Sequence, residues 1–361
     1  VLSPGASSWK LVEADWRTGK IIKTIGWANG DLGDGETPCS VDRARTVAVC
    51  VAQTLTAPQI LARVDLRAGT VTPMDAMQSG QQTLDFQFRD VRVENRFGWM
   101  STGFLALPKG ESDHAVPLAV MLYGFTKQFS RNAQWITSYP IADFVHAGIA
   151  VLMLNWAHDP SGRLHKRETL MTSLESDTST VANAVPAVRS LGIKVSRSMI
   201  MGWSFGGLYA AYAIQHLHEY VAAQVGDPAQ WNIVEYALAG EFWRNLADLQ
   251  FGGPPNSHNV QNYIAYDPVA DGKRAHGPIL FEFVRHNPGA GQLLGEWRDA
   301  GSEVEAFAYR DSVHWLNVPA EARLSRERNL DWAKVNLLGP QAVSAAELRR
   351  HFILDSVRAL G

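Results

Sequence analysis

The sequence predicts an α/β protein with a mostly parallel sheet covered by helices on both faces, preceded by a segment of short strands. Two observations lead to this fold class. Beyond residue 86, strand-like and helix-like segments alternate along the chain, which is the pattern of parallel sheets with helical crossovers. One of the strand-like runs, Ala150–Leu154, is apolar throughout, as strands buried on both faces are.

The N-terminal region, residues 1–85, combines short strand-like runs with turn residues. Strands are expected at 9–16, 20–25, 46–51 and 59–66. The stretch Asp65-Leu-Arg-Ala-Gly-Thr-Val suits the hairpin of a β-propeller blade. At roughly 40 residues per blade, the region is long enough for about two blades, too few to close a ring. We therefore expect a partial β-propeller over 1–85.

The strand edges of a partial propeller lack partners, a situation that natural proteins avoid. We therefore expect a companion propeller segment, supplied by the same precursor or by a separate chain. The first residues, Val1-Leu-Ser-Pro, lack the basic and apolar stretches of a signal peptide. They indicate that something was removed or that the chain begins within a longer product.

The second region, residues 86–361, is predicted to form one catalytic domain. It opens with a hairpin over 85–94 and 99–107. Further strands are expected at 118–123, 149–154, 198–201, 221–225, 278–284 and 303–309. Helices are expected at 131–146, 173–190, 206–218, 292–300 and 321–337, with a tail helix near 343–359.

An aromatic-rich insertion interrupts this alternation over 227–277. Aromatic side chains offer a large contact area at low entropic cost, so we expect Trp231 and Trp243 to contact a peptide substrate. The alternative is that the aromatic residues form the core of a cap subdomain.

The composition excludes several classes of protein. Hydrophobic residues make up 46% and charged residues 19% of the 361 residues, which supports a substantial core and excludes global disorder. The 33 basic and 36 acidic residues give a formal net charge of -3, so no basic excess is present to hold nucleic acid. No apolar run approaches the roughly 20 residues of a membrane span.

No pattern in the chain is typical of a metal or cofactor site. The two cysteines do not form a CxxC pair and no histidine lies near them, so zinc is not expected. Gly289, Gly291 and Gly295 follow a strand and open a helix, which imitates a dinucleotide fingerprint. Only one strand follows, whereas a dinucleotide-binding domain needs several further crossovers. We therefore expect no metal and no cofactor.

Cys39 and Cys50 lie near two neighbouring strand-like runs, at 40–46 and 47–51. A cross-strand disulfide between them would indicate an oxidising compartment. The alternative is a pair of buried thiols. The sequence does not otherwise specify the compartment.

Ser204 is the candidate nucleophile. It lies in Gly202-Trp-Ser204-Phe-Gly206, between an expected strand and an expected helix, which is the setting of the nucleophile elbow in α/β-hydrolase folds. The turn is so sharp that side chains at the two glycines would collide with the neighbouring strand and helix. Ser204 would then project at the edge of the sheet, beside a helix N-terminus that favours developing negative charge.

A serine needs an adjacent base, and His314 is the candidate because it follows the last expected strand. The oxyanion hole needs two donors. We expect one to be the backbone N–H of Phe205, directly after the nucleophile. The other is expected after the strand at 118–123, where Tyr123 could supply its phenolic O–H.

These residues together resemble the prolyl oligopeptidase family of serine hydrolases. The resemblance rests on the partial propeller, the hairpin end Gly103-Phe-Leu-Ala-Leu-Pro-Lys-Gly, the pair Tyr123-Gly124, the elbow and the late histidine. Other stretches are most similar to the lasso peptide isopeptidases within that family. They are Phe129-Ser-Arg-Asn-Ala-Gln-Trp, Gly148-Ile-Ala-Val-Leu, Arg328-Asn-Leu-Asp-Trp, and the two cysteines ahead of 58–66.

The resemblance implies hydrolysis of an amide bond in a constrained peptide. Lasso peptides are threaded macrolactam rings, and the isopeptidases of the family cut the bond between the N-terminal amine and an Asp or Glu side chain. It implies that Ser204 attacks, that His314 carries the proton, and that Tyr123 and the Phe205 amide hold the oxyanion. The propeller would form one wall of the cavity.

The triad acid is where the sequence departs from the family pattern. The family places an Asp or Glu just after the seventh sheet strand, but here that loop reads Val284-Arg-His-Asn-Pro-Gly-Ala-Gly. Glu282, inside the strand, is our first expectation, because a charge among apolar neighbours requires a partner. Asn287 and Asp227 are the alternatives, followed by a Ser–His dyad.

Two other functions are compatible with this pattern. One is a general esterase or aminopeptidase of the same fold. The other is a non-catalytic peptide-binding relative that has lost its acid.

Overall fold

A computed structural model describes most of the chain, which divides into two compact units with the boundary after Gln87. The described residues are 2–4, 9–27, 30–33, 39–54, 60–74, 86–109, 114–122, 139, 141–157, 168–229, 233–238, 240–265, 275–285, 287 and 289–344.

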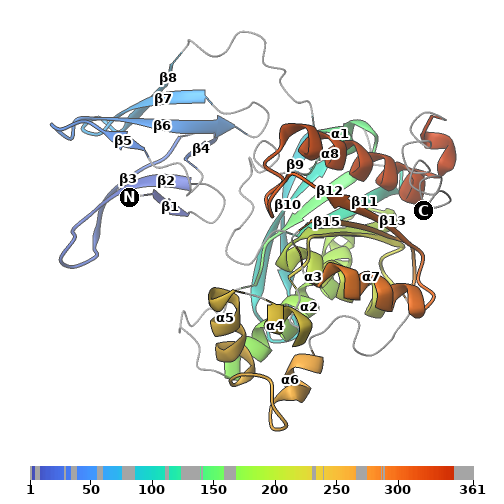
Figure 1. Cartoon of the computed structure of the whole chain (residues 1–361). Coiled ribbons are helices and arrows are strands. Elements are labelled where there is room, and N and C mark those ends of the chain that lie inside the picture. The colour runs from blue at the N-terminus through green and yellow to red at the C-terminus, as the bar shows by residue number, and fades with distance from the viewer. Residues whose placement is uncertain are drawn as a thin grey trace. The chain divides into compact units, whose positions relative to one another are not determined.

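The N-terminal unit contains two antiparallel sheets (Figure 1). The first has the order β1-β2-β3, formed by β1 (Leu2–Pro4), β2 (Trp9–Ala14) and β3 (Ile21–Ile25). The second has the order β4-β6-β7-β8, with β5 pairing to β6. Its strands are β4 (Gly30–Leu32), β5 (Ser40–Val41), β6 (Val47–Thr54), β7 (Ile60–Asp65) and β8 (Thr70–Pro73).

Among the described residues of this unit, the two sheets share a small core and a polar link. Buried side chains from both, including Leu11, Ile25 and Val64, pack in a single cluster. The ammonium group of Lys23, on β3, donates to the backbone oxygens of Leu66 at 2.9 Å and Arg67 at 2.7 Å. These oxygens belong to the turn after β7, so one cation ties the first sheet to a hairpin of the second.

Cys39 and Cys50 form a disulfide bond. Ser40 pairs with Val49 in the antiparallel register of β5 and β6, so the preceding and following residues face each other. The disulfide therefore links the two strands at the end of the ladder away from their connecting turn. This is one of the two alternatives stated for the cysteines.

The C-terminal unit is built on an eight-stranded sheet of order β16-β15-β14-β13-β11-β12-β10-β9. Its strands are β9 (Gln87–Glu94), β10 (Met100–Leu107), β11 (Val116–Leu122), β12 (Ala150–Leu154), β13 (Val195–Trp203), β14 (Ala222–Gly226), β15 (Ile279–Val284) and β16 (Val304–Tyr309). The six strands β16, β15, β14, β13, β11 and β12 pair in parallel with their neighbours, whereas β10 pairs antiparallel to β12. The predicted α/β class is confirmed, with a mixed sheet.

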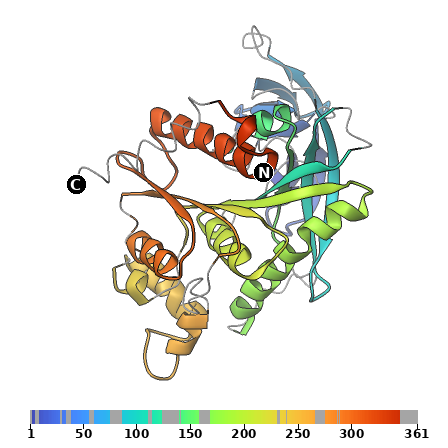
Figure 2. The same ribbon diagram turned by 90° about the vertical axis from the view of Figure 1, so that its right-hand side faces the viewer.

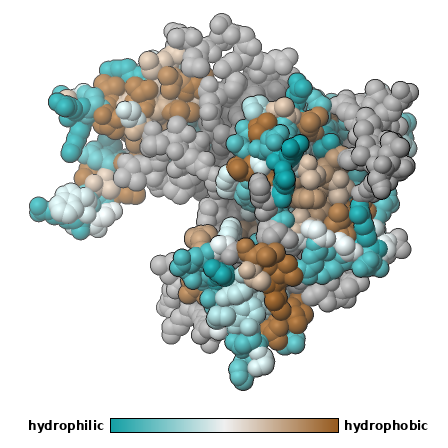
Figure 3. Space-filling model, viewed as in Figure 1, coloured by the Kyte–Doolittle hydropathy of each residue, from teal (hydrophilic) through white to brown (hydrophobic). Residues whose placement is uncertain are grey.

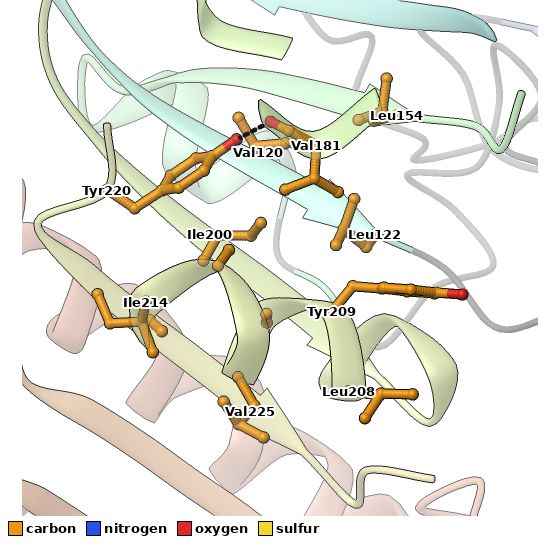
Figure 4. Packing of buried hydrophobic residues seen from close by; sticks show 14 of the residues in the cluster. Val120, Leu122, Leu154, Val181, Ile200, Leu208, Tyr209, Ile214, Tyr220 and Val225 are labelled. Atoms are coloured by element: carbon orange, nitrogen blue, oxygen red, sulfur yellow. Dashed lines mark hydrogen bonds between the residues drawn. The ribbon is translucent and has the colours of Figure 1, made fainter. Parts of the chain in front are cut away.

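Helices cover both faces of this sheet (Figure 2). One face carries α1 (Ile141–His146) and α8 (Pro319–Ala333). The opposite face carries α2 (Glu168–Ser190), α3 (Phe205–His216) and α7 (Ala290–Asp299). Figure 4 shows the core beneath α3, where Ile200 and Val225 of the sheet meet Leu208 and Ile214 of the helix. The fully apolar strands are thus explained by burial on both sides.

The helix expected over 321–337 differs from the structure at both ends. It begins earlier, because Pro319 occupies the first turn, where its missing N–H costs nothing. It gives way at Lys334 to a π-helical turn over Lys334–Leu338, followed by a 3-10 turn at Pro340–Ala342. The tail helix expected near 343–359 lies almost entirely outside the described residues.

The described part of the insertion over 227–277 contains three short helices, α4 (Ile233–Leu238), α5 (Glu241–Phe251) and α6 (Val260–Ala265). Phe251 and Tyr263 are buried and in ring contact, so part of the aromatic content forms a local core. Hydrophobic side chains also gather on the surface over α4 (Figure 3), among them Ile233, Val234 and Leu238. No helix among the described residues is long and apolar enough to cross a membrane.

Candidate active site

Ser204 occupies the sharp turn between β13 and α3. Its backbone φ of 59° and ψ of -122° lie in a region that non-glycine residues avoid, and such strain is concentrated at functional sites. A Cβ atom at Gly202 would lie 2.0 Å from the backbone oxygen of Gly206, and one at Gly206 would lie 2.6 Å from that of Leu122. Both glycines are therefore required by the turn.

Backbone hydrogen bonds attach this turn to the end of β14. The amide of Ser204 donates to the backbone oxygen of Gly226 at 2.9 Å, and the amide of Ala229 donates to that of Ser204 at 3.0 Å. Asp227 lies between Gly226 and Ala229, the two residues whose backbone groups bond to Ser204. Ser204 and the first residues of the insertion are thus held together by backbone hydrogen bonds.

His314 lies in the loop between β16 and α8, where the sequence placed it. Glu321, in the first turn of α8, accepts hydrogen bonds from the backbone amides of the residues that precede the histidine, namely Arg310, Asp311 and Ser312, at 3.0, 3.1 and 2.8 Å. Desolvation acts to raise the pKa of Glu321, but a hydrogen bond from the side chain of Ser312, together with these backbone hydrogen bonds, outweighs it and holds the pKa below its usual range. A charged carboxylate therefore fixes the loop.

Asp227 is the carboxylate in contact with His314. Its Oδ2 meets Nδ1 of the histidine, and its side chain is buried. Its Oδ1 accepts hydrogen bonds from the backbone amide of Val284 at 3.1 Å and from Nδ2 of Asn287 at 2.9 Å. Asp227 directly follows β14 and adopts a φ of 32°, so the chain turns sharply there.

The expectation that Glu282 orients His314 therefore has to be corrected. Glu282 is fully buried on β15, and its carboxylate is surrounded by other partners. Its two oxygens contact Tyr309 on β16, Gln224 on β14, and Ser325, Arg328 and Asn329 on α8. The buried charge does have partners, but they belong to α8 and the neighbouring strands and do not include His314.

Burial raises the pKa of Glu282, and Arg328 is the largest influence acting against that rise, followed by hydrogen bonds from Tyr309, Gln224 and Ser325. The guanidinium of Arg328 also lies over the ring of Phe307, 3.3 Å from its centroid. Such a network attaches α8 to the sheet, and α8 carries the carboxylate of Glu321 that fixes the histidine loop.

The remaining predicted site residues are placed as follows. Phe205 is buried and begins α3, so its backbone amide lies at the helix N-terminus beside Ser204. Trp243 lies on α5 and lines the cavity described below. Tyr123 and Trp231 lie outside the described residues.

A cavity of about 560 Å³ contains the candidate triad. Ser204, Asp227 and His314 form part of its wall, together with Asn287 at the end of β15. Its other walls come from the insertion, the end of β15 and the histidine loop, through Pro228, Ala229, Glu235, Leu238, Gly240, Trp243, Val284, Val313 and Trp315. Most of these side chains are apolar, as in pockets that bind organic ligands.

The sequence alone did not identify several residues of this wall. Leu238, Val313 and Trp315 have no motif of their own, because any apolar residue could form such a surface. Among the described residues no group of three or more His, Cys, Asp or Glu side chains could hold a metal ion. The cavity brings together a serine, an imidazole and a carboxylate, the three groups used in nucleophilic catalysis by serine.

Solved structures with this architecture are numerous. A puromycin-hydrolyzing peptidase of Mycobacterium tuberculosis superposes with a TM-score of 0.72 at 18% identity, covering 92% of this chain and 52% of that one. The fold is that of the prolyl oligopeptidase family. The AtxE2 isopeptidase gives 0.72 at 17% identity, covering 97% of this chain and 55% of that one. An acylaminoacyl peptidase of Pyrococcus horikoshii gives 0.71 at 16%, covering 92% and 53%.

These similarities concern the fold, and the chain spans about half the length of these prolyl oligopeptidase family structures. No family model and no curated protein matches the sequence.

Proposed function

We propose that the chain is the catalytic part of a serine peptidase in which Ser204, His314 and Asp227 form the triad. The observation that carries this proposal is the contact between Nδ1 of His314 and the buried carboxylate of Asp227, in the same cavity as the strained Ser204. A carboxylate on Nδ1 fixes the tautomer in which Nε2 can accept the proton of the serine hydroxyl.

The proposed mechanism is acyl transfer through an acyl-enzyme on Ser204. His314 takes the hydroxyl proton as the serine oxygen attacks the carbonyl carbon, and it then gives this proton to the leaving amine. Asp227 stabilises the imidazolium that forms between these steps. The amide of Phe205, at the N-terminus of α3, is proposed as one donor to the oxyanion, and Tyr123 as the other. Water then releases the acyl group by the reverse path.

A non-catalytic relative is the alternative that would follow if the chain had no carboxylate to orient His314. The contact between Asp227 and His314 argues against that alternative, because it supplies a carboxylate from the neighbouring strand.

For the substrate we propose a constrained peptide, with an isopeptide bond of a threaded macrolactam as the bond that is cut. Support comes from the sequence resemblance to lasso peptide isopeptidases and from the structural similarity to AtxE2 isopeptidase over 97% of this chain. The cavity wall from the insertion, which includes Trp243, offers an apolar contact surface for such a peptide. A general esterase or aminopeptidase is the second candidate, favoured by the similarity to the acylaminoacyl and puromycin-hydrolyzing peptidases.

We further propose that the N-terminal unit is part of a β-propeller that a companion segment completes. The unit has two small sheets whose end strands, such as β3 and β8, have a neighbour on one side only in the described sheet order. The related structures are about twice as long as this chain, which leaves room for further blades.

The function is tested by incubating the protein with threaded macrolactam peptides, their unthreaded isomers, linear peptides and a small chromogenic ester. An isopeptidase adds one water to the macrolactam, which mass spectrometry detects, whereas turnover of the ester alone would favour the second candidate. A fluorophosphonate probe should label Ser204, and Ser204→Ala should abolish labelling and lower turnover about a millionfold. Labelling of another serine would contradict the proposed nucleophile.

A further inference from the structure

Asn287 is held in one orientation at the end of β15, beside the proposed acid. Its Oδ1 accepts a hydrogen bond of 3.1 Å from the backbone amide of Gly289. This contact identifies the oxygen of the amide, so the opposite end is the NH₂ group. That group donates to Oδ1 of Asp227 at 2.9 Å and lies 3.5 Å from the backbone oxygen of Pro228.

The two oxygens of Asp227 therefore have separate environments. Oδ1 receives two N–H donors, from Asn287 and from the backbone of Val284. Oδ2 faces Nδ1 of His314. The donors fix the plane of the carboxylate, so the oxygen that faces the imidazole cannot turn away without loss of both hydrogen bonds.

We propose that Asn287 is a positioning residue for catalysis, which acts on His314 through the carboxylate of Asp227. The proposal rests on the proposed triad. This role can be told apart from a structural one by the direction of the hydrogen bond between positions 287 and 227. While position 227 carries a carboxylate, position 287 must carry a hydrogen-bond donor. If position 227 carried an amide, the requirement would reverse, and an acceptor would be needed at 287.

Asp227→Asn alone should lose activity on the order of 10⁴-fold. Two donors still point at the site of Oδ1, so the new amide turns its oxygen toward them and its NH₂ toward His314. The histidine must then accept at Nδ1, which is the wrong tautomer for a base at Nε2.

The double variant Asp227→Asn/Asn287→Asp exchanges the two groups. A charged acceptor at 287 attracts the NH₂ of the amide at 227, which turns the amide oxygen toward Nδ1 of His314. We expect kcat at least about tenfold above that of Asp227→Asn. The recovery is partial, because the amide of Val284 still points at the same position.

Asn287→Ala should lower kcat about 10- to 100-fold with little change in KM, since it removes one of the two donors from a buried carboxylate. Asn256→Ala is the matched control. The side-chain oxygen of Asn256 also accepts from the amide two residues later, at 2.8 Å, but the residue lies between α5 and α6 and does not line the cavity. That variant should keep full activity.

The assay uses the full chain, the rate of fluorophosphonate labelling of Ser204 and the hydrolysis of a small ester. Recovery in Asp227→Asn/Asn287→Asp, and none in Asp227→Asn/Asn287→Ala, supports the proposal. Equal activity of both double variants and Asp227→Asn, with all variants folded by circular dichroism, overturns it. If the unchanged protein fails to label at Ser204 or to turn over any substrate, the proposed function itself is wrong.

Discussion

The indole N–H of Trp203 donates a hydrogen bond of 2.7 Å to the backbone oxygen of His314. Trp203 is the residue before Ser204, so this bond joins the elbow directly to the loop of His314. The same indole packs against the small cluster of Val284, Tyr309 and Leu316. The position of the histidine relative to Ser204 is therefore set by a residue that the elbow motif leaves variable.

Trp203→Phe should lower kcat about three- to tenfold and leave KM almost unchanged, because it keeps a ring in the cluster and removes one hydrogen bond. Steady-state kinetics on a small ester measures both constants. Trp297→Phe is the control, since the indole N–H of this buried residue has no hydrogen-bond partner among the described residues. A loss of kcat of similar size in Trp297→Phe would show that the effect is general destabilisation.

Glu282→Gln should separate stability from catalysis. The substitution weakens a buried pair with Arg328 and disturbs the hydrogen bonds from α8, so the free energy of unfolding should fall by about 3 kcal/mol. Urea unfolding measures this loss. The fraction that remains folded should keep most of its kcat, whereas folded Asp227→Asn should not. A Glu282→Gln variant that is stable but inactive would restore Glu282 as the orienting acid.

Trp243→Ala should raise KM for a peptide more than for a small ester. Its ring lines the cavity and also lies 6.4 Å, between ring centroids, from Phe205 beside the nucleophile. Phe242→Ala is a matched control, because the neighbouring Phe242 is 71% exposed and does not line the cavity. An equal rise of KM for both substrates in Trp243→Ala would indicate destabilisation in place of a lost contact.

Asp177 on α2 should make stability depend on pH. Burial raises the pKa of its carboxyl from 3.8 to about 7, against a hydrogen bond of 2.9 Å from the hydroxyl of Tyr209 that lowers it. As the pH rises from about 4 to about 7, the unfolded chain releases this proton first, so the folded state binds more protons and loses stability over that range. The loss is on the order of 4 kcal/mol.

Asp177→Asn keeps an acceptor for Tyr209 and removes the ionisation. Its free energy of unfolding should therefore fall less than that of the unchanged protein between about pH 4 and about pH 7, and it should be the more stable of the two above that range. Urea unfolding at several pH values measures this difference. Parallel pH profiles of the two proteins would rule out a raised pKa at Asp177.

The sheet could be predicted because most residues of its central strands are apolar on both faces, and the elbow could be predicted because Gly202 and Gly206 mark close backbone approaches. The carboxylate that contacts His314 could not be predicted in this way. Residues at the ends of β14 and β15 are neighbours in space, and the sequence does not show which end turns toward the histidine. The choice depends on the φ of 32° at Asp227, a local feature of one non-glycine residue.

The aromatic residues of the insertion are a second feature that the sequence could predict only in part. Its aromatic residues were predicted as one class, yet the structure divides them. Phe251 and Tyr263 are buried against each other, whereas Trp243 lines the cavity. Both groups lie on short helices whose mutual packing, rather than composition, decides which ring is covered.

The location of Asp227 has a consequence for engineering new substrate specificity. This residue is the first one after β14 and also the first residue of the insertion, while the next strand begins only at Ile279. A graft that replaces the insertion from its first residue would delete the carboxylate together with the wall. A graft that retains Asp227, Pro228 and Ala229 keeps the acid and the hydrogen bond from Ala229 to Ser204. Exchange of caps between related hydrolases should therefore start after Ala229, so that recognition changes and the catalytic residues are inherited intact.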